Sequence, residues 1–279
     1  MGALFGTNGI RGLANIELTP EFAAKVGVAV GTFFGGGEII TGSDARCTSP
    51  MLLSALISGL LSAGCTVYNI GFAPTPTIQY TVKEHNVEGG VIITASHNPP
   101  EYNGIKVVAK DGVEISRAEE SAVEEIFFGE SFKRAKWNNV GEYRTLENIF
   151  DEYLNGVMKH INVEAIRKKN FKVVVDPANG VGALSLPRFL NELGCRVYAI
   201  NADLDGSFPS RPPEPRPENL GELKEAVKAL EADFGVALDG DADRAIFVDE
   251  KGEIHWGDKT FALIAKFFLI KNPKSTIVT

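Results

Sequence analysis

Short apolar runs alternate along the chain with longer segments in which apolar residues recur every three or four positions. The short runs predict buried strands, and the longer periodic segments predict amphipathic helices. The predicted strands are residues 39–41, 66–70, 91–94, 105–109, 173–176, 196–200, 234–238, 245–248 and 253–255. The predicted helices are residues 20–34 and 50–64, a short one after 74–76, and 118–128, 149–161, 183–193, 220–230 and 258–270. This alternation predicts α/β layers with largely parallel or mixed sheets.

The alternation is interrupted once, by a polar and highly charged stretch at residues 114–144. It then restarts, which predicts a first domain over residues 1–147 and a second over residues 148–250. Residues 251–279 begin a third unit, and its last apolar run, 275–279, predicts one more strand. Because no helix follows to cover the sheet of that strand, we expect the third unit to be incomplete.

Composition and charge exclude several classes of protein. The 279 residues are 44% apolar and carry a formal net charge of −8, which gives no overall attraction to nucleic acid or to an anionic membrane. Local basic groups must therefore bind any anionic substrate. The longest apolar stretch, 51–65, is shorter than the ~20 residues of a membrane span, and no signal peptide precedes it, so we expect a cytoplasmic protein. The three cysteines are widely spaced, and we interpret them as structural.

Three aspartates at alternate positions follow the predicted strand 234–238: Asp239, Asp241 and Asp243. Carboxylates this close repel one another unless a cation lies between them. Oxygen ligands suit Mg²⁺ or another hard ion, and Gly240 and Ala242 allow the loop to bend tightly around it. The position after an apolar strand is typical of an α/β active site.

Two other interpretations of this acidic loop stay open. A solvated acidic turn needs no ion. The spacing also partly meets that of an EF-hand calcium loop with Asp239 at the first position, but Arg244 stands at the sixth position, where the turn requires glycine. The predicted flanks are strands, whereas an EF-hand loop joins two helices. The pattern therefore favours a different kind of metal loop.

The segment TASHNPP at residues 94–100 follows another apolar strand. Ser96, at the strand end among turn-forming residues, is exposed enough to act as a nucleophile or to carry a phosphoryl group. His97 adjoins it and would not readily reach its hydroxyl as a base, and no G-x-S-x-G motif is present, which disfavours a serine hydrolase. Ten residues on, Lys106 begins the next strand, and it is equally well explained as a surface lysine.

Two further loops carry charges that suit an anion. The glycine-punctuated segment 5–12 exposes backbone N–H groups and includes Arg11, so it is able to bind phosphate. The segment 42–46 contains Asp44 and Arg46, which alternatively pair with each other. Neither loop is specific on its own.

Together these segments resemble those of the α-D-phosphohexomutases, which interconvert sugar 1-phosphates and 6-phosphates. The matching motifs are FGTNGIRG at 5–12, TASHNP at 94–99, NGIK at 103–106, DPANG at 176–180, PENL at 217–220 and DGDADR at 239–244. The resemblance implies successive three-layer α/β domains with mixed, largely parallel sheets, the third domain being incomplete. The segment 94–106 is similar to the phosphomannomutase/phosphoglucomutase branch, whereas the first motif is also similar to phosphoglucosamine mutases, so the sugar stays open.

The resemblance also implies a role for each matching residue. Ser96 is the phosphorylated serine, and together with the three aspartates it binds one Mg²⁺. Arg11 and Lys106 flank the sugar oxygen and the phosphoserine and assist proton transfer. The substrate is a hexose or hexosamine phosphate. Contacts to phosphate or substrate are implied for Thr7, His97, Asn98 and Arg244.

Two functions of other kinds are weighed against this one. The first is a divalent-cation binding module without turnover, because family members are longer and have four domains, and the sugar-binding and distal-phosphate loops of domains three and four do not appear in this sequence. The second is a phosphatase acting on phosphosugars, which is disfavoured because the acidic loop lacks the Asp-x-Asp-x-Thr pattern of an aspartate nucleophile.

Overall fold

A six-stranded mixed sheet forms the centre of the first domain in the computed structural model, which describes residues 4–6 and 9–278. The strand order is β1-β5-β4-β2-β3-β6; β2 runs parallel to β3 and β4, and β5 runs antiparallel to β1 and β4. The strands are β1 (Ile10–Leu13), β2 (Glu38–Ser43), β3 (Thr66–Phe72), β4 (Gly89–Ile93), β5 (Tyr102–Ala109) and β6 (Tyr143–Thr145). The helices are α1 (Pro20–Phe33), α2 (Ser49–Ser62), α3 (Thr75–Glu84), α4 (Arg117–Gly129) and α5 (Ile149–Met158).

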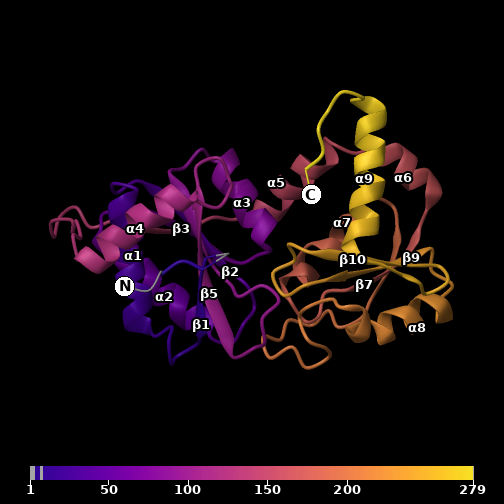
Figure 1. Ribbon diagram of the computed structural model, residues 1–279, viewed down its shortest axis with the longest axis horizontal. Helices are drawn as coiled ribbons and strands as arrows, with labels where there is room; N and C mark the ends of the chain where they lie inside the picture. The colour runs from indigo at the N-terminus through magenta and orange to yellow at the C-terminus, as the bar shows by residue number, and fades with distance from the viewer. Residues whose placement is uncertain (1–3, 7–8, 279) are drawn as a thin grey trace.

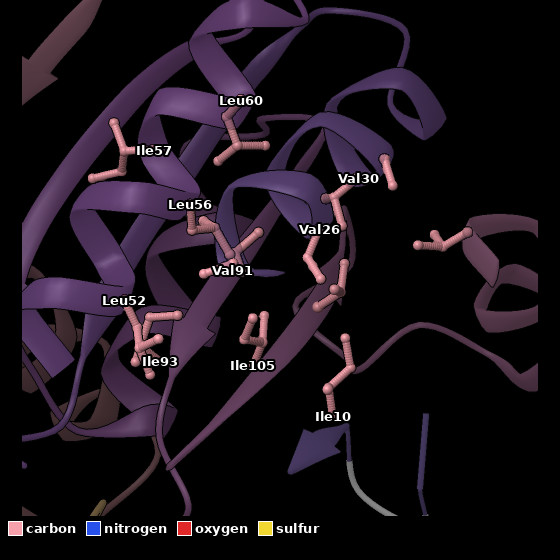
Figure 2. Close-up of a cluster of buried hydrophobic side chains, with 14 of the residues drawn as sticks. Ile10, Val26, Val30, Leu52, Leu56, Ile57, Leu60, Val91, Ile93 and Ile105 are labelled. Carbon is pink, nitrogen blue, oxygen red and sulfur yellow. The ribbon is translucent and has the colours of Figure 1, made fainter. Parts of the chain in front are cut away.

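Helices cover both faces of this sheet, because neighbouring residues of a buried strand point to opposite sides. Ile39 and Val91 join a core with α1, α2 and α4, whereas Ile40 and Ile92 join a second core with α3 and α5. The arrangement confirms the predicted three layers. Figure 2 shows the first core, in which the labelled helix residues are Val26, Val30, Leu52, Leu56, Ile57 and Leu60.

Helices α1 and α2 approach each other closely through two glycines. A Cβ atom on Gly27 would lie 2.2 Å from the carbonyl oxygen of Leu56, and one on Gly59 would lie 2.2 Å from that of Ala24. Both distances are far below a van der Waals contact, so this packing needs glycine at both positions. The start of α1 agrees with the prediction, since Thr19 Oγ1 accepts a hydrogen bond from the backbone N–H of Phe22.

A five-stranded mixed sheet with the order β11-β10-β9-β7-β8 forms the second domain, the orange half of the molecule in Figure 1. Its strands are β7 (Lys172–Asp176), β8 (Arg196–Ala199), β9 (Phe234–Leu238), β10 (Ala245–Asp249) and β11 (Ile254–His255). Its helices are α6 (Val163–Lys169), α7 (Leu186–Glu192) and α8 (Gly221–Ala229), with short 3₁₀-helices η1 (Val181–Leu184) and η2 (Pro217–Asn219). One core lies between this sheet and α8, and another between the sheet and α6 and α7.

The last helix, α9 (Gly257–Lys271), stands away from this sheet in Figure 1. Every residue of α9 is described, and none of them is buried. Its large exposed apolar side chains are Phe261, Leu263, Ile264, Phe267, Phe268 and Ile270. Across residues 4–6 and 9–278, no helix combines the length and the apolar character that crossing a membrane requires.

The structure differs from the predicted elements at several places. Strands β1 and β6 and helix α6 are absent from the prediction, the predicted helix 149–161 ends earlier as α5, and the predicted helix 183–193 is divided into η1 and α7. The strand predicted at 275–279 is wrong as far as the structure describes it, because residues 275–278 adopt no strand and pair with neither sheet, while Thr279 lies outside the described residues. An apolar run becomes a strand only where a neighbouring strand binds its N–H and C=O groups.

Candidate active site

Ser96 lies in the loop between β4 and β5, at the join of the two domains. Its backbone has a left-handed φ of +52°, which is uncommon for a residue with a side chain. The backbone N–H of Ser96 donates to Thr94 Oγ1 over 2.8 Å. The residue is 2% exposed, so the prediction of an exposed serine is wrong: the surrounding loops cover it and fix the position of its hydroxyl.

Arg46 binds the loop between β4 and β5 that carries Ser96, which is called the serine loop below. Its guanidinium is fully buried and pairs with Asp44 at 3.0 Å, which confirms the pairing that the sequence allowed. The same guanidinium also donates to four carbonyl oxygens of the serine loop, those of Ser96, Asn98, Pro99 and Tyr102. The carbonyl of the buried Ser96 would be the costliest to leave without a partner, because an unpaired buried acceptor costs about 1–3 kcal/mol. Arg46 is therefore a residue that shapes the site, and sequence reasoning did not identify it as such.

The three aspartates follow β9 and reach the serine across the domain join. Ser96 Oγ donates a hydrogen bond to Asp239 Oδ2 over 2.7 Å, although 143 positions separate the two residues. Carboxylate oxygens of Asp239, Asp241 and Asp243 lie within 4.8 Å of one another. Asp239 and Asp241 are completely buried, which contradicts the solvated-turn interpretation. The flanking elements β9 and β10 are strands, which contradicts an EF-hand.

The electrostatics of this cluster favour a bound cation. Burial raises the pKa of Asp239 well above its ordinary value, and the charges of Asp241 and Asp243 raise it further. Asp241 is held charged instead: burial opposes this, but Lys106 and the hydroxyl of Thr75 lower its pKa overall. Asp241 Oδ1 is buried and has no hydrogen-bond partner among the described residues. A hard cation fits this place, since it would bind the free oxygen and offset the repulsion.

Lys106 projects from β5 toward the same aspartates. Its Nζ lies 3.2 Å from Asp243 Oδ2, 3.5 Å from Asp241 Oδ2 and 3.6 Å from Glu114 Oε1. The residue is 3% exposed, so it is not a surface lysine. Burial acts to lower the pKa of its ammonium group, but the surrounding carboxylates more than compensate and raise it. Glu114 is a further member of the site that sequence reasoning missed.

Arg11, His97 and Asn98 lie next to Ser96, in or against the same loop. Arg11 extends from β1 and donates to Asn98 Oδ1 over 2.5 Å and to the carbonyl oxygen of Ala95 over 3.1 Å. His97 Nδ1 lies 3.4 Å from Ser96 Oγ, closer than the sequence suggested but longer than a good hydrogen bond. Burial, and next the charge of Arg244, lower the pKa of His97, which favours a neutral ring.

Arg244 lies at the mouth of the site. Its side chain is 42% exposed, and its guanidinium is 3.6 Å from Glu214 and 4.0 Å from Asp243. The backbone N–H of Arg244 donates to Asp239 Oδ1 over 3.1 Å. Beside it, a cleft of about 850 Å³ runs between the serine loop, through His97 and Asn98, and the proline-rich loop 207–219. A phosphorylated sugar has room to enter here. Thr7 lies outside the described residues.

Two sequence models of one family match this chain. The model described as phosphoglucomutase/phosphomannomutase, alpha/beta/alpha domain I, matches residues 2–134, and the model of alpha/beta/alpha domain II matches residues 151–252. The chain belongs to the phosphoglucomutase/phosphomannomutase family. The first matched region contains strands β1 to β5 of the six-stranded sheet, and the second contains strands β7 to β10 of the five-stranded sheet.

Similar proteins carry mutase names. A phosphoglucomutase/phosphomannomutase of Thermococcus kodakarensis is 54% identical over 100% of this chain and 62% of its own length. A phosphoglucosamine/phosphogalactosamine mutase of Sulfurisphaera tokodaii is 50% identical over 99% of this chain and 61% of its own length. The crystal structure of a putative phosphomannomutase from Thermus thermophilus superposes with a TM-score of 0.86 at 30% identity, over 96% of this chain and 61% of that one. The chain thus spans about 60% of the length of the relatives it matches.

In this member of the phosphoglucomutase/phosphomannomutase family, tight backbone contacts join the two domains around the site. A Cβ atom on Gly206 would lie 2.1 Å from the carbonyl oxygen of Ala45, and one on Gly240 would lie 2.7 Å from that of Ser96. Arg211 fixes the start of the aspartate loop 239–243, because it pairs with Asp176 at 2.7 Å and donates to the carbonyl oxygen of Leu238, the residue before Asp239. The serine and the aspartates are therefore held by one continuous set of contacts.

Proposed function

We propose that this chain carries the phosphoryl-transfer centre of a phosphohexomutase, which interconverts sugar 1-phosphates and 6-phosphates through a phosphorylated Ser96. The observation that carries the proposal is the hydrogen bond of 2.7 Å from Ser96 Oγ to Asp239 Oδ2, inside a cluster of three carboxylates. A serine hydroxyl against buried carboxylates has no evident use in packing. It fits a phosphoryl carrier whose negative charge is neutralised by a metal ion.

Asp239, Asp241 and Asp243 would hold one Mg²⁺ together with an oxygen on Ser96. Their oxygen donors, and the buried unpartnered Oδ1 of Asp241 in the described structure, fit such an ion. When bound, the ion stabilises the charge that develops on the transferring phosphoryl group. Arg11, Lys106 and Arg244 add positive charge around Ser96. This local charge attracts a phosphate group, although the net charge of the whole chain is −8.

The proposed reaction has two transfers. In the first, the bond from phosphorus to Ser96 Oγ breaks and a bond from phosphorus to a sugar hydroxyl oxygen forms, which gives a sugar bisphosphate. The proton of that hydroxyl ends on Ser96 Oγ, assisted by Lys106 and Arg11, which are proposed to flank the reacting oxygens. The bisphosphate then turns round: the bond from its other phosphorus to the sugar oxygen breaks, a bond from that phosphorus to Ser96 Oγ forms, and the proton returns from Ser96 to the freed sugar oxygen. Positioning and charge neutralisation are the main needs of such transfers, and a rigid buried site supplies both.

The substrate is proposed to be a hexose or hexosamine phosphate. The relatives' names include glucose, mannose, glucosamine and galactosamine phosphates, so they support the substrate class and leave the sugar to be measured. His97 and Asn98 line the cleft, and Arg244 lies 3.6 Å from Glu214, which also lines it; all three are proposed to contact the phosphate or the sugar. Thr7 is proposed for the same role on the resemblance of its loop alone.

The experiment that tests the proposal uses the full-length protein with glucose 1,6-bisphosphate and Mg²⁺. Intact-mass measurement should show one added phosphoryl group, located on Ser96 by peptide mapping. Assays with mannose, glucose and glucosamine 1-phosphates should then show which 6-phosphate forms. Release of inorganic phosphate without isomerisation would indicate a phosphatase, and Mg²⁺ binding without any phosphorylation would indicate a cation-binding module.

The domain boundaries and the cellular location of the protein are also proposals. We propose domain boundaries at residues 147 and 250, so that residues 1–147 carry the serine loop, 148–250 carry the metal loop and 251–279 start a third domain. Location in the cytoplasm also stays a prediction from the sequence.

A further inference from the structure

Thr75 connects the first domain to the metal loop of the second. It is the first residue after Pro74 in α3, and it is 2% exposed. Its Oγ1 donates to Asp241 Oδ2 over 2.7 Å, and its backbone N–H donates to the carbonyl oxygen of Asp241 over 2.9 Å. Two hydrogen bonds thus join one residue of the first domain to one aspartate that lies 166 positions later.

These bonds determine which oxygen of Asp241 is free. Oδ2 accepts from Thr75 and lies 3.5 Å from Lys106 Nζ, whereas Oδ1 is buried and finds no partner in the described part of the chain. Both oxygens of Asp239 already accept, one from Ser96 and one from the backbone of Arg244. A buried carboxylate oxygen without a partner is unfavourable in the folded chain, so its fixed direction points to a ligand.

We propose that Thr75 is a positioning residue for the cation: its hydroxyl turns Asp241 so that Oδ1 faces the metal. The proposal rests on the metal role given to the aspartates under the proposed function. Hydrogen bonds that orient a metal ligand typically contribute 10–100-fold to metal affinity. Because this bond crosses the domain join, the packing of α3 in the first domain sets the metal affinity of a loop in the second.

The hydroxyl of Thr75 does not act as a cap of helix α3. Pro74 precedes α3 and forms no side-chain cap, and the hydroxyl of Thr75 is directed at Asp241 rather than at the backbone of its own helix. Thr77 offers a matched control two residues on in α3. It is the same residue type, it is 0% exposed, and its Oγ1 has no hydrogen-bond partner among the residues described.

The test uses five versions of the 279-residue chain, which are compared with one another. They are the wild type and the variants Thr75→Val, Thr75→Ser, Thr77→Val and Asp241→Asn. Mg²⁺ affinity is measured by calorimetry, and Mn²⁺ affinity by the electron paramagnetic resonance signal of the free ion. Thr75→Val should bind both ions 10–100-fold more weakly, and Asp241→Asn should bind at least as weakly. Thr75→Ser, which keeps the hydroxyl, should stay within about threefold of the wild type, and Thr77→Val should equal it.

Unchanged affinity in Thr75→Val, or an equal loss in Thr77→Val, would overturn the role of Thr75 while leaving the metal site in place. If the wild type binds neither ion, the metal role of the aspartates fails, and the inference fails with it. Circular dichroism checks that each variant is folded. Should Thr75→Val not fold, Thr75→Ala removes the same hydroxyl with less bulk, and the same affinities decide the question.

Discussion

Arg46 and Phe208 face each other across the join between the two domains, with the guanidinium carbon 5.1 Å from the centroid of the ring. Phe208 is 6% exposed and has a left-handed φ of +51°. The ring of Phe208 therefore packs against a planar face of the Arg46 guanidinium. The N–H groups around the edge of that guanidinium bind Asp44 and four carbonyl oxygens of the serine loop. A cation over an aromatic face contributes about 2 kcal/mol when both are shielded from water. Arg46 thus links the shape of the serine loop to the docking of the second domain.

Arg46→Lys should destabilise the chain although it keeps the charge. A lysine ammonium cannot reach Asp44 and all four carbonyls at once, so several buried acceptors lose their partner. We expect the free energy of unfolding to fall by about 3 kcal/mol, as measured by urea denaturation. Arg196→Lys, on the exposed strand β8, is the matched control and should change it by less than about 0.5 kcal/mol. Equal effects of the two substitutions would contradict the role given to Arg46.

Ser96→Ala in the full-length protein should abolish normal mutase turnover and leave the fold intact. The hydroxyl takes part in the bond to Asp239, whereas the contacts that hold the loop use the backbone of Ser96. We expect the variant to take up no phosphoryl group from glucose 1,6-bisphosphate in intact-mass measurements, with an unchanged circular dichroism spectrum. Ser58→Ala, whose side chain is exposed on α2, should behave as the wild type. Substantial turnover by Ser96→Ala would move the phosphoryl carrier elsewhere.

The stability of the chain in a chelating buffer should depend on pH through Asp239. Burial and the neighbouring carboxylates raise the pKa of Asp239 in the folded state above its ordinary value of 3.8. The folded state therefore retains this proton at pH values where the unfolded chain has lost it. Stability contributed by the protonated group is complete below about pH 4, is lost as pH rises through the folded-state pKa, and stays constant above it.

Asp239→Asn isolates this contribution, because an amide does not titrate and its oxygen still accepts from Ser96. Urea denaturation between pH 4 and pH 9 should show the free energy of unfolding falling less steeply with pH in the variant than in the wild type. Above the folded-state pKa the variant should be the more stable of the two in chelator. Adding Mg²⁺ should stabilise the wild type and have little effect on the variant. Parallel pH profiles for both proteins would show that Asp239 is charged throughout.

A protein that consists of residues 1–279 alone should bind Mg²⁺ and accept a phosphoryl group on Ser96, but should interconvert hexose phosphates far more slowly than the full-length protein. Under the proposed function, the residues described supply only the reacting end of a cleft, and the chain spans 62% of the length of a mutase that is 54% identical to it. Correct orientation of a bound reactant lowers a reaction barrier by roughly 7–11 kcal/mol. A protein that orients its substrate less well therefore reacts orders of magnitude more slowly. Kinetic assays of both proteins side by side would decide, and near-equal turnover would contradict the expectation.

Local patterns in the sequence were sufficient for most of the architecture. The apolar runs of β4 and β9 and the capped start of α1 depend on residues within one element, so their periodicity predicts them directly. The same is true of the three aspartates, whose spacing predicts a cation site. Resemblance to the phosphohexomutases then joined Ser96 to this cluster, a link that spacing along the chain does not contain.

Other features depend on tertiary structure, because they are set by contacts between residues far apart in the sequence. Strand β1 forms because β5 lies beside it, whereas the apolar residues 275–278 lie beside no strand in the described chain. Arg46 and Thr75 are an ordinary arginine and threonine in the sequence. Arg46 gains its role when the serine loop folds against it, and Thr75 gains its role when the aspartate loop of the second domain comes within hydrogen-bond distance. The physical reason is that a hydrogen bond or a buried charge depends on which surfaces dock. Docking depends on residues more than 100 positions apart, which no short-range pattern records.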